Sequence, residues 1–70
     1  MATGIIVRNL GVLSGEPIFR GTRVPFKALT DYIEHGRTLN EFLEDFPSVT
    51  RAEAIAALEE ARVRLAEALR

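Results

Sequence analysis

Residues 38–53 read Thr-Leu-Asn-Glu-Phe-Leu-Glu-Asp-Phe-Pro-Ser-Val-Thr-Arg-Ala-Glu, and this stretch decides the fold. It holds the same helix-starting motif twice, at Thr38 and at Thr50, each with a Glu three residues further on. In this capping box the Thr hydroxyl accepts from the backbone N–H of the Glu, and the carboxylate accepts from the Thr amide. Pro47 ends the first helix, because the residue before a proline is disfavoured in the α conformation. The stretch therefore predicts two consecutive helices joined by a tight turn.

Apolar residues recur at helical spacing on both sides of this turn. The first helix carries a full apolar stripe made of Leu39, Phe42, Leu43 and Phe46. The last helix is predicted to run from Arg51 to about Leu69, with an apolar face of Ala54, Ile55, Leu58, Ala61, Leu65 and Leu69. Arg62 lies in this face, where an apolar residue is expected, and Glu60 and Arg64 form a favourable pair on the opposite side.

Upstream of residue 38 the sequence predicts one more helix and short strands. Residues 26–35 form the helix, with Phe26, Leu29 and Ile33 on one face and a stop at Gly36. Residues 5–8 contain three β-branched side chains in a row and predict a short strand. Residues 18–19 and 22–24 are predicted to be two further strands about a tight turn.

These elements define the expected fold class and domain organisation. We expect a mainly α, three-helix, helix-turn-helix-like domain with short N-terminal β-strands or a hairpin. Residues 1–70 form one domain, divided into a β-strand or hairpin region (1–25), a helix-turn-helix-like core (26–61) and a C-terminal extension of the last helix (62–70). A chain of 70 residues buries only roughly 60% of its unfolded surface, so we expect a homodimer or another partner chain to add stability.

The composition argues against metals, cofactors and membranes. The chain has no Cys and one His, so a thiolate metal site is excluded. Glu41, Glu44 and Asp45 lie on the solvent side of one short helix and are not expected to converge on a metal. No apolar run approaches the roughly 20 residues that span a bilayer. With no secretory pattern at the N-terminus, we expect a cytoplasmic protein that binds no cofactor.

Catalysis is not expected either. Ser14, Asp31 and His35 have the side chains of a hydrolase triad, but nothing in the sequence brings Ser14 near the other two. The presence of His35 is explained by its place at a helix C-terminus, where the helix dipole favours a cation. The glycines at 11 and 15 are not followed by the Lys-Ser/Thr pair of a phosphate loop. We therefore assign no catalytic residue and expect no enzyme.

The charge is unevenly spread along the chain and bears on DNA binding. Residues 1–37 carry five basic and three acidic groups, a net +2, whereas residues 38–70 carry four basic and seven acidic groups, a net −3. A helix-turn-helix would present the start of the last helix to DNA. The predicted DNA contacts are Ser48, Thr50 and Arg51 there, together with Arg20, Arg23, Lys27 and Arg37 in the basic half. The alternative is a helical hairpin that serves packing alone.

The end of the last helix favours protein binding. A three-helix core needs this helix only as far as about Ala61, yet the amphipathic pattern continues to Leu69. Amphipathic helices of this kind dock in grooves of partner proteins. We predict that Arg62, Leu65 and Leu69 contact a partner. The alternatives are that Arg62 lies along a dimer surface or marks the end of the core.

Two runs of the sequence resemble a known family. They are Gly-Glu-Pro-Ile-Phe-Arg-Gly-Thr-Arg-Val-Pro-Phe at 15–26 and Gly-Arg-Thr-Leu-Asn-Glu-Phe-Leu at 36–43, followed by Phe46-Pro47. With them the chain resembles the bacterial and archaeal domain of unknown function 433 family from about Leu13 to Ala61. The matched motif residues are Gly15, Pro17, Gly21, Thr22, Arg23 and Pro25.

The resemblance implies a small helix-turn-helix-like protein. It also implies a VapB-like antitoxin that binds a PIN-like ribonuclease toxin and, as a dimer, its own operator DNA. Our hypothesis is thus an antitoxin of a type II toxin–antitoxin system that neutralises such a toxin and regulates its operon. The alternatives are a stand-alone helix-turn-helix transcriptional regulator and a dimerisation module with neither role.

Overall fold

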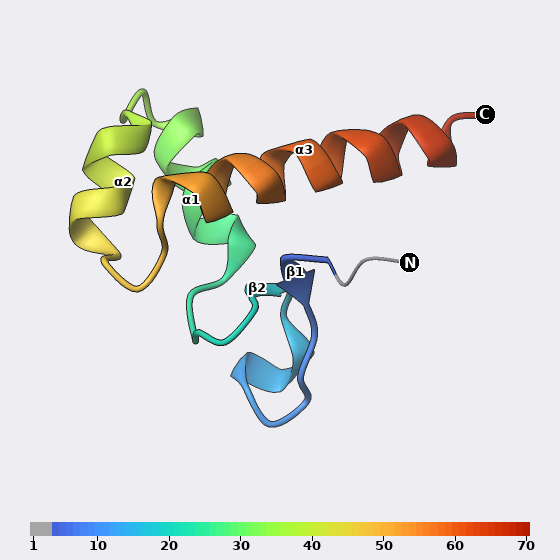
Figure 1. Cartoon of the computed structure of the whole chain (residues 1–70), viewed down its shortest axis with the longest axis horizontal. Helices are drawn as coiled ribbons and strands as arrows, with labels where there is room; N and C mark the ends of the chain where they lie inside the picture. Colours follow the sequence, from blue (N-terminus) through green and yellow to red (C-terminus); the bar gives the residue numbers. More distant parts are fainter. Residues whose placement is uncertain (1–3) are drawn as a thin grey trace.

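The computed structural model describes residues 4–70 and is mainly α (Figure 1). Its elements are β1 (Ile6–Val7), a short 3₁₀ helix η1 (Leu13–Gly15), β2 (Ile18–Phe19), α1 (Phe26–Glu34), α2 (Leu39–Asp45) and α3 (Arg51–Ala68). The predicted fold class of three helices with a short two-stranded antiparallel hairpin is confirmed. Residues 1–3 of the predicted N-terminal β region lie outside the described residues.

Both predicted capping boxes are present. The Thr38 hydroxyl accepts from the Glu41 N–H at 3.1 Å, and the Glu41 carboxylate accepts from the Thr38 N–H at 2.8 Å. At the start of α3 the same two bonds join Thr50 and Glu53, at 3.1 and 2.9 Å. Phe46 caps the end of α2, and the Val49 N–H donates back to the Phe46 carbonyl at 3.0 Å. The tight turn between α2 and α3 follows from these local bonds.

Phe42 lies at the centre of the core and is fully buried. Its ring contacts the rings of Phe19, Tyr32 and Phe46, at centroid distances of 6.0, 5.6 and 4.9 Å. The other buried members of this cluster are Phe19, Leu29, Val49, Ala54 and Ala57. Leu39, Leu43 and Phe46 pack around it, so the predicted apolar stripe of α2 is confirmed.

The pairing of the strands differs from the prediction. β2 pairs antiparallel with β1, Ile6 opposite Phe19 and Val7 opposite Ile18. Residues 22–24 form no strand, although the chain does turn back antiparallel to β2 as predicted: the Phe19 N–H donates to the Val24 carbonyl at 3.0 Å, and Ile18 pairs with Pro25 in a single bridge. The Thr22 hydroxyl donates to the Phe19 carbonyl and accepts from the Val24 N–H, so it takes over hydrogen bonds that a strand would make and holds a tight turn. Gly21 supplies the positive φ of this turn.

The face that α3 turns toward the core also differs from the prediction. Ala54 and Ala57 are buried against the core, whereas Ile55 and Leu58 are 51% and 40% exposed. Small side chains at the contact let the helix approach the aromatic cluster closely. Ile33 of α1 is likewise exposed, because α1 turns Leu29 and Tyr32 inward instead.

The C-terminal half of α3 projects beyond the other elements (Figure 1). Every residue from 62 to 70 is exposed. Within residues 4–70 no helix is both long enough and apolar enough to cross a membrane.

Candidate functional site

Four exposed apolar residues of the last helix lie along one line with Arg62 among them, and we call this line the α3 seam. It consists of Ile55, Leu58, Arg62, Leu65 and Leu69, spaced alternately three and four residues apart. This is the spacing of residues that face a second helix in a coiled coil. Leu65 and Leu69 are 60% and 76% exposed, and both lie on the projecting half of α3. The structure therefore brings the predicted Arg62, Leu65 and Leu69 together on one open surface.

Arg62 interrupts the seam with a charge that its own helix partly neutralises. Its Nε donates to Glu59 Oε2 at 3.0 Å, and both side chains are exposed. The hydrogen bond from Arg62 lowers the pKa of Glu59 and raises that of Arg62. An exposed pair of this kind contributes little to stability and can exchange its partner at low cost. Arg62 can therefore turn to an acidic group of a bound protein.

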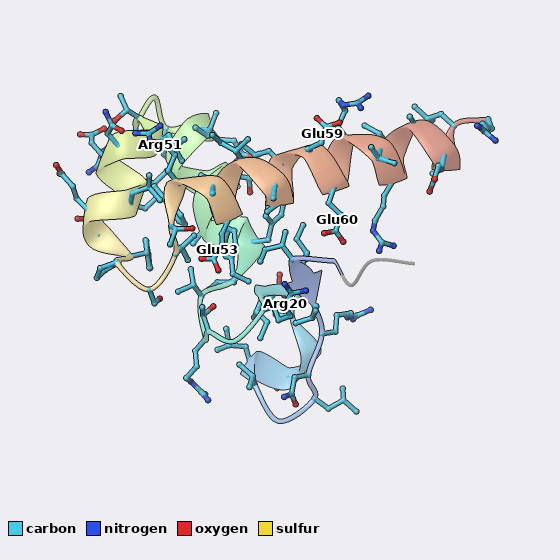
Figure 2. All side chains as sticks on the ribbon, in the orientation of Figure 1. Arg20, Arg51, Glu53, Glu59 and Glu60 are labelled. Carbon is cyan, nitrogen blue, oxygen red and sulfur yellow. The ribbon has the colours of Figure 1, made fainter. Side chains whose placement is uncertain are left out.

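The opposite side of α3 is used inside the molecule. Figure 2 shows Glu60 directed toward β1 and Glu59 on the other side of the helix. Glu60 Oε1 accepts from the N–H groups of Ile5 at 2.8 Å and Ile6 at 3.4 Å. The predicted Glu60–Arg64 pair is confirmed at 3.2 Å. The hydrogen bond between Glu60 and Ile5 was not predicted, since it joins residues 55 positions apart in the sequence.

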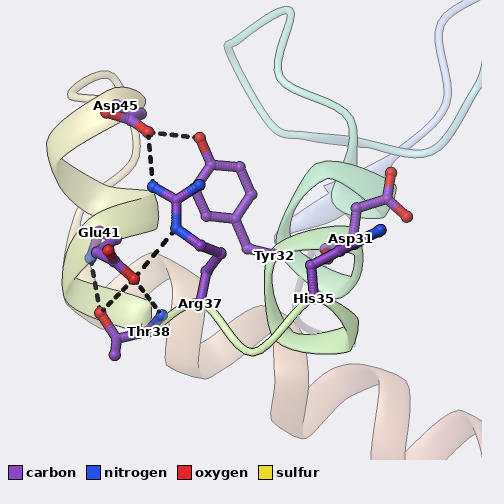
Figure 3. Close-up of polar contacts among 7 residues, drawn as sticks. All are labelled: Asp31, Tyr32, His35, Arg37, Thr38, Glu41 and Asp45. Atoms are coloured by element: carbon purple, nitrogen blue, oxygen red, sulfur yellow. Dashed lines mark hydrogen bonds and ion pairs between the residues drawn. The ribbon is translucent and has the colours of Figure 1, made fainter.

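Four of the five predicted DNA-contacting cations have partners within the chain: Arg20 donates to the Gly4 carbonyl, and the other three contact side chains. Lys27 pairs with Asp31 at 3.0 Å, and Arg51 donates to the Asn40 side chain. Arg37 pairs with Glu41 at 3.2 Å and with Asp45 at 3.8 Å, and it lies over the Tyr32 ring at 4.9 Å (Figure 3).

The Thr50 hydroxyl caps α3 and is therefore already used. Beside it the Glu53 carboxylate places a negative charge at the helix start, where a phosphate would have to bind. The start of α3 is thus less suited to phosphate than the sequence pattern suggests.

The remaining predicted DNA contacts gather elsewhere. Arg20, Arg23 and Ser48 line an open hollow of about 920 Å³, which we call the arginine hollow. Arg8, which we did not predict, lines it as well. The pairing of β1 with β2 places Arg8 on the same hollow as Arg20, and the sequence gives no signal for this pairing.

The triad considered for catalysis is not assembled among the described residues. Ser14 and Asp31 line a shallow hollow of about 440 Å³, and His35 is not among its lining residues. The Asp31 carboxylate pairs with Lys27, and the His35 ring contacts the backbone carbonyl of Asp31 at 2.7 Å. Within residues 4–70 no three His, Cys, Asp or Glu side chains are placed to hold a metal ion.

A family profile described as "Protein of unknown function (DUF433)" matches residues 6–61. The chain therefore belongs to this family. No curated protein and no solved structure matches it. The matched region holds the hairpin and the core, and it ends at Ala61, where the projecting half of α3 begins. Arg62, Leu65 and Leu69 lie outside the match.

Proposed function

We propose that this protein is an antitoxin of a type II toxin–antitoxin system, and that it binds and neutralises a PIN-like ribonuclease toxin. The observation that carries the proposal is the α3 seam, whose leucines at 65 and 69 are 60% and 76% exposed on a helix that projects from its domain. Full burial of one leucine side chain stabilises a complex by about 1.5–3 kcal/mol. Two leucines together thus supply much of a specific binding energy before any polar contact.

The α3 seam fits a helix that docks in a groove of another protein. Its residues lie one or two turns apart along one line, as anchors of a docked helix do. Arg62 adds a charged group that pairs well with a carboxylate at an interface. The α3 seam is not needed for packing of the core, because α3 packs against the core through its alanines. Folding and partner binding therefore use different faces of one helix.

A pull-down against a PIN-like protein encoded beside this gene tests the proposal. The variant Leu65→Asp/Leu69→Asp is expected to lose binding at least about 100-fold, since it removes both anchors and buries two charges. Leu10→Asp is the matched control, because Leu10 is 87% exposed and lies on the loop after β1. It should bind as the wild type does. Ribonuclease activity should return when the double variant replaces the wild type.

The proposal fails if a chain that ends at Ala61 still binds and neutralises the toxin. It also fails if the Leu65→Asp/Leu69→Asp variant binds as tightly as Leu10→Asp does. Either result would move the contact to another surface.

Operator DNA binding is the second candidate function, either as part of the antitoxin role or as that of a stand-alone regulator. Ser48, Thr50 and Arg51 are exposed at the start of α3, as a recognition helix requires. A gel shift with the upstream DNA is expected to show a complex that weakens steeply with salt and with Arg51→Ala. Absence of a complex at low salt, with and without toxin, would exclude this function.

A homodimer is part of the same proposal, because a dimer doubles the contacts to DNA and adds buried surface to a small core. Analytical ultracentrifugation is expected to give twice the mass of the chain. A stable monomer would exclude both the dimer and a simple dimerisation module.

A further inference from the structure

The arginine hollow gathers three arginines, and none of its lining residues carries a carboxylate. Arg8, Arg20 and Arg23 come from three positions around the hairpin and its turn, and Ser48 joins them from the turn between α2 and α3. The hollow's other lining residues are Val7, Asn9, Leu10, Val12, Ile18, Gly21 and Thr22, so no described lining residue carries a carboxylate. The chain as a whole has a net charge of −1, so this concentration of cations is a local feature.

Two of the arginines are available for an anion in different ways. Arg8 donates from its Nε to the Gly15 carbonyl at 2.8 Å, which holds the side chain in place while its terminal nitrogens remain for another acceptor. Arg23 is exposed and makes no hydrogen bond or ion pair with the described residues. Arg20 is fixed through its Nη1 to the Gly4 carbonyl. A guanidinium held in this way loses little entropy when it binds a phosphate through two hydrogen bonds.

The cations outside the hollow provide a contrast. Lys27, Arg37, Arg62 and Arg64 each pair with a carboxylate of their own chain. A cation with such a partner has to give it up before it binds a phosphate, whereas Arg8 and Arg23 do not.

We propose that the arginine hollow binds the phosphate backbone of a nucleic acid. The inference rests on the DNA-binding part of the proposed function and moves its main phosphate contacts from α3 to the hairpin. Because Ser48 also lines the hollow, a nucleic acid bound there passes the turn before α3. Backbone contacts of this kind position a protein on DNA without reading its sequence.

Fluorescence anisotropy with a short labelled DNA duplex tests the inference on the full chain. For duplex DNA the logarithm of the binding constant falls with the logarithm of salt by about 0.9 for each phosphate contact. Arg8→Gln/Arg23→Gln is expected to lower this slope by about two and to weaken binding at low salt at least about tenfold. Arg8→Lys/Arg23→Lys, which keeps the charge, should retain most of the slope.

Arg64→Gln/Arg70→Gln is the control, since it removes the same charge from exposed positions outside the hollow. It should keep the wild-type slope, and thermal melting should show that all variants are folded. A hollow variant with the slope of this control overturns the inference. Polyglutamate that competes as well as unlabelled duplex overturns it too, and would assign the hollow to an acidic peptide.

Two further measurements separate this inference from the proposed function. If Arg51→Ala abolishes binding while the hollow variant binds normally, operator binding stands and the arginine hollow is excluded. If the hollow variant loses DNA but still binds the toxin, the two surfaces act separately, as we expect. If the wild type binds no duplex at low salt, both the inference and the second candidate function fail.

Discussion

Thr50 and Glu53 exchange two hydrogen bonds at the first turn of α3, and this small motif fixes where the longest helix begins. Thr50→Ala removes the hydroxyl that accepts from the Glu53 N–H. We expect the free energy of unfolding to fall by about 1 kcal/mol, the usual value of such a cap. Urea denaturation followed by circular dichroism measures it. Thr50→Ser retains the acceptor and should stay close to the wild type, so equal losses in both variants would contradict the role of the hydroxyl.

The capping box at Thr38 makes the stability of the fold depend on pH. The Glu41 carboxylate accepts from the Thr38 N–H and also pairs with Arg37, and the pKa of Glu41 lies below its ordinary value of 4.5. Folding therefore favours the ionised form, and this contribution is fully present above about pH 4.5. It is lost as the pH falls through the folded-state pKa. We expect the unfolding free energy of the wild type to decrease more steeply there than that of Glu41→Gln, which cannot ionise.

Urea denaturation at a series of acidic pH values compares the two chains. Glu44→Gln is the control, because Glu44 is exposed on the same helix and is not part of the capping box. Its pH dependence should follow the wild type. Parallel curves for the wild type and Glu41→Gln would contradict this account.

Single residues differ in how far the sequence reveals their roles. The capping boxes are local patterns, so their hydrogen bonds are predictable from the sequence alone. The role of Glu60 has no local pattern, since the N–H groups that donate to its carboxylate lie at the other end of the chain. Arg8 is similar, because only the register between β1 and β2 brings it to the arginine hollow.

At the scale of elements, Glu60 fastens the hairpin to α3. Its side chain is only 15% exposed, and one of its carboxylate oxygens accepts from both the Ile5 and the Ile6 N–H. Glu60→Ala leaves these two donors without their acceptor, and we expect a loss of about 1–3 kcal/mol in unfolding free energy. Amide hydrogen exchange at Ile5 and Ile6 should accelerate in this variant. Glu60→Gln keeps an acceptor oxygen and should show a smaller effect.

Glu59→Ala is the matched control for the hydrogen bonds between Glu60 and residues 5–6, because it removes the neighbouring carboxylate from the other side of α3. Its effect on exchange at Ile5 and Ile6 should be negligible. Equal acceleration in the Glu59 and Glu60 variants would show that the hairpin is held by other contacts.

The elements were predictable where local signals agree, and less so where packing decides. The three helices begin and end within a residue or so of their predicted bounds, because caps, glycine and proline mark them. The pairing of β2 with β1, 12 residues earlier, was not predicted, since it depends on packing against the helices. The predicted return of the chain beside β2 is present only as a single bridge between Ile18 and Pro25. The predicted apolar face of α3 matches its buried face only at Ala54, whereas Ile55 and Leu58 are exposed. Its large apolar residues suggested the core, but the core takes its alanines.

At the scale of the whole molecule, the core and the two proposed binding surfaces occupy separate regions. The aromatic core joins α1, α2 and the first turns of α3, while the projecting half of α3 and the arginine hollow remain open. The sequence revealed the first of these surfaces, because the amphipathic pattern runs on past the core. The arginine hollow was predictable only in part, since Arg20, Arg23 and Ser48 were among the predicted DNA contacts and Arg8 was not.

This separation predicts that the projecting half of α3 can be removed without unfolding the domain. In a chain that ends at Ala61, the removed residues are all exposed, so we expect the unfolding free energy to change by less than about 1 kcal/mol. The transition should stay cooperative, with only the helical signal of the lost turns missing. Phe42→Ala is the positive control, because emptying a fully buried aromatic site costs about 3–5 kcal/mol.

The outcome decides how a loss of toxin binding in the same truncated chain is to be understood. If the truncated chain is stable and does not bind the toxin, the α3 seam acts as a binding surface. If the truncated chain unfolds, residues 62–70 stabilise the domain. Because these residues are exposed in the single chain, contact with a second copy becomes the physical explanation. A concentration-dependent melting temperature of the full chain would then follow, because dissociation would precede unfolding. The Leu65→Asp/Leu69→Asp variant would show the same loss of stability, whereas a pure toxin-binding seam leaves its melting temperature unchanged.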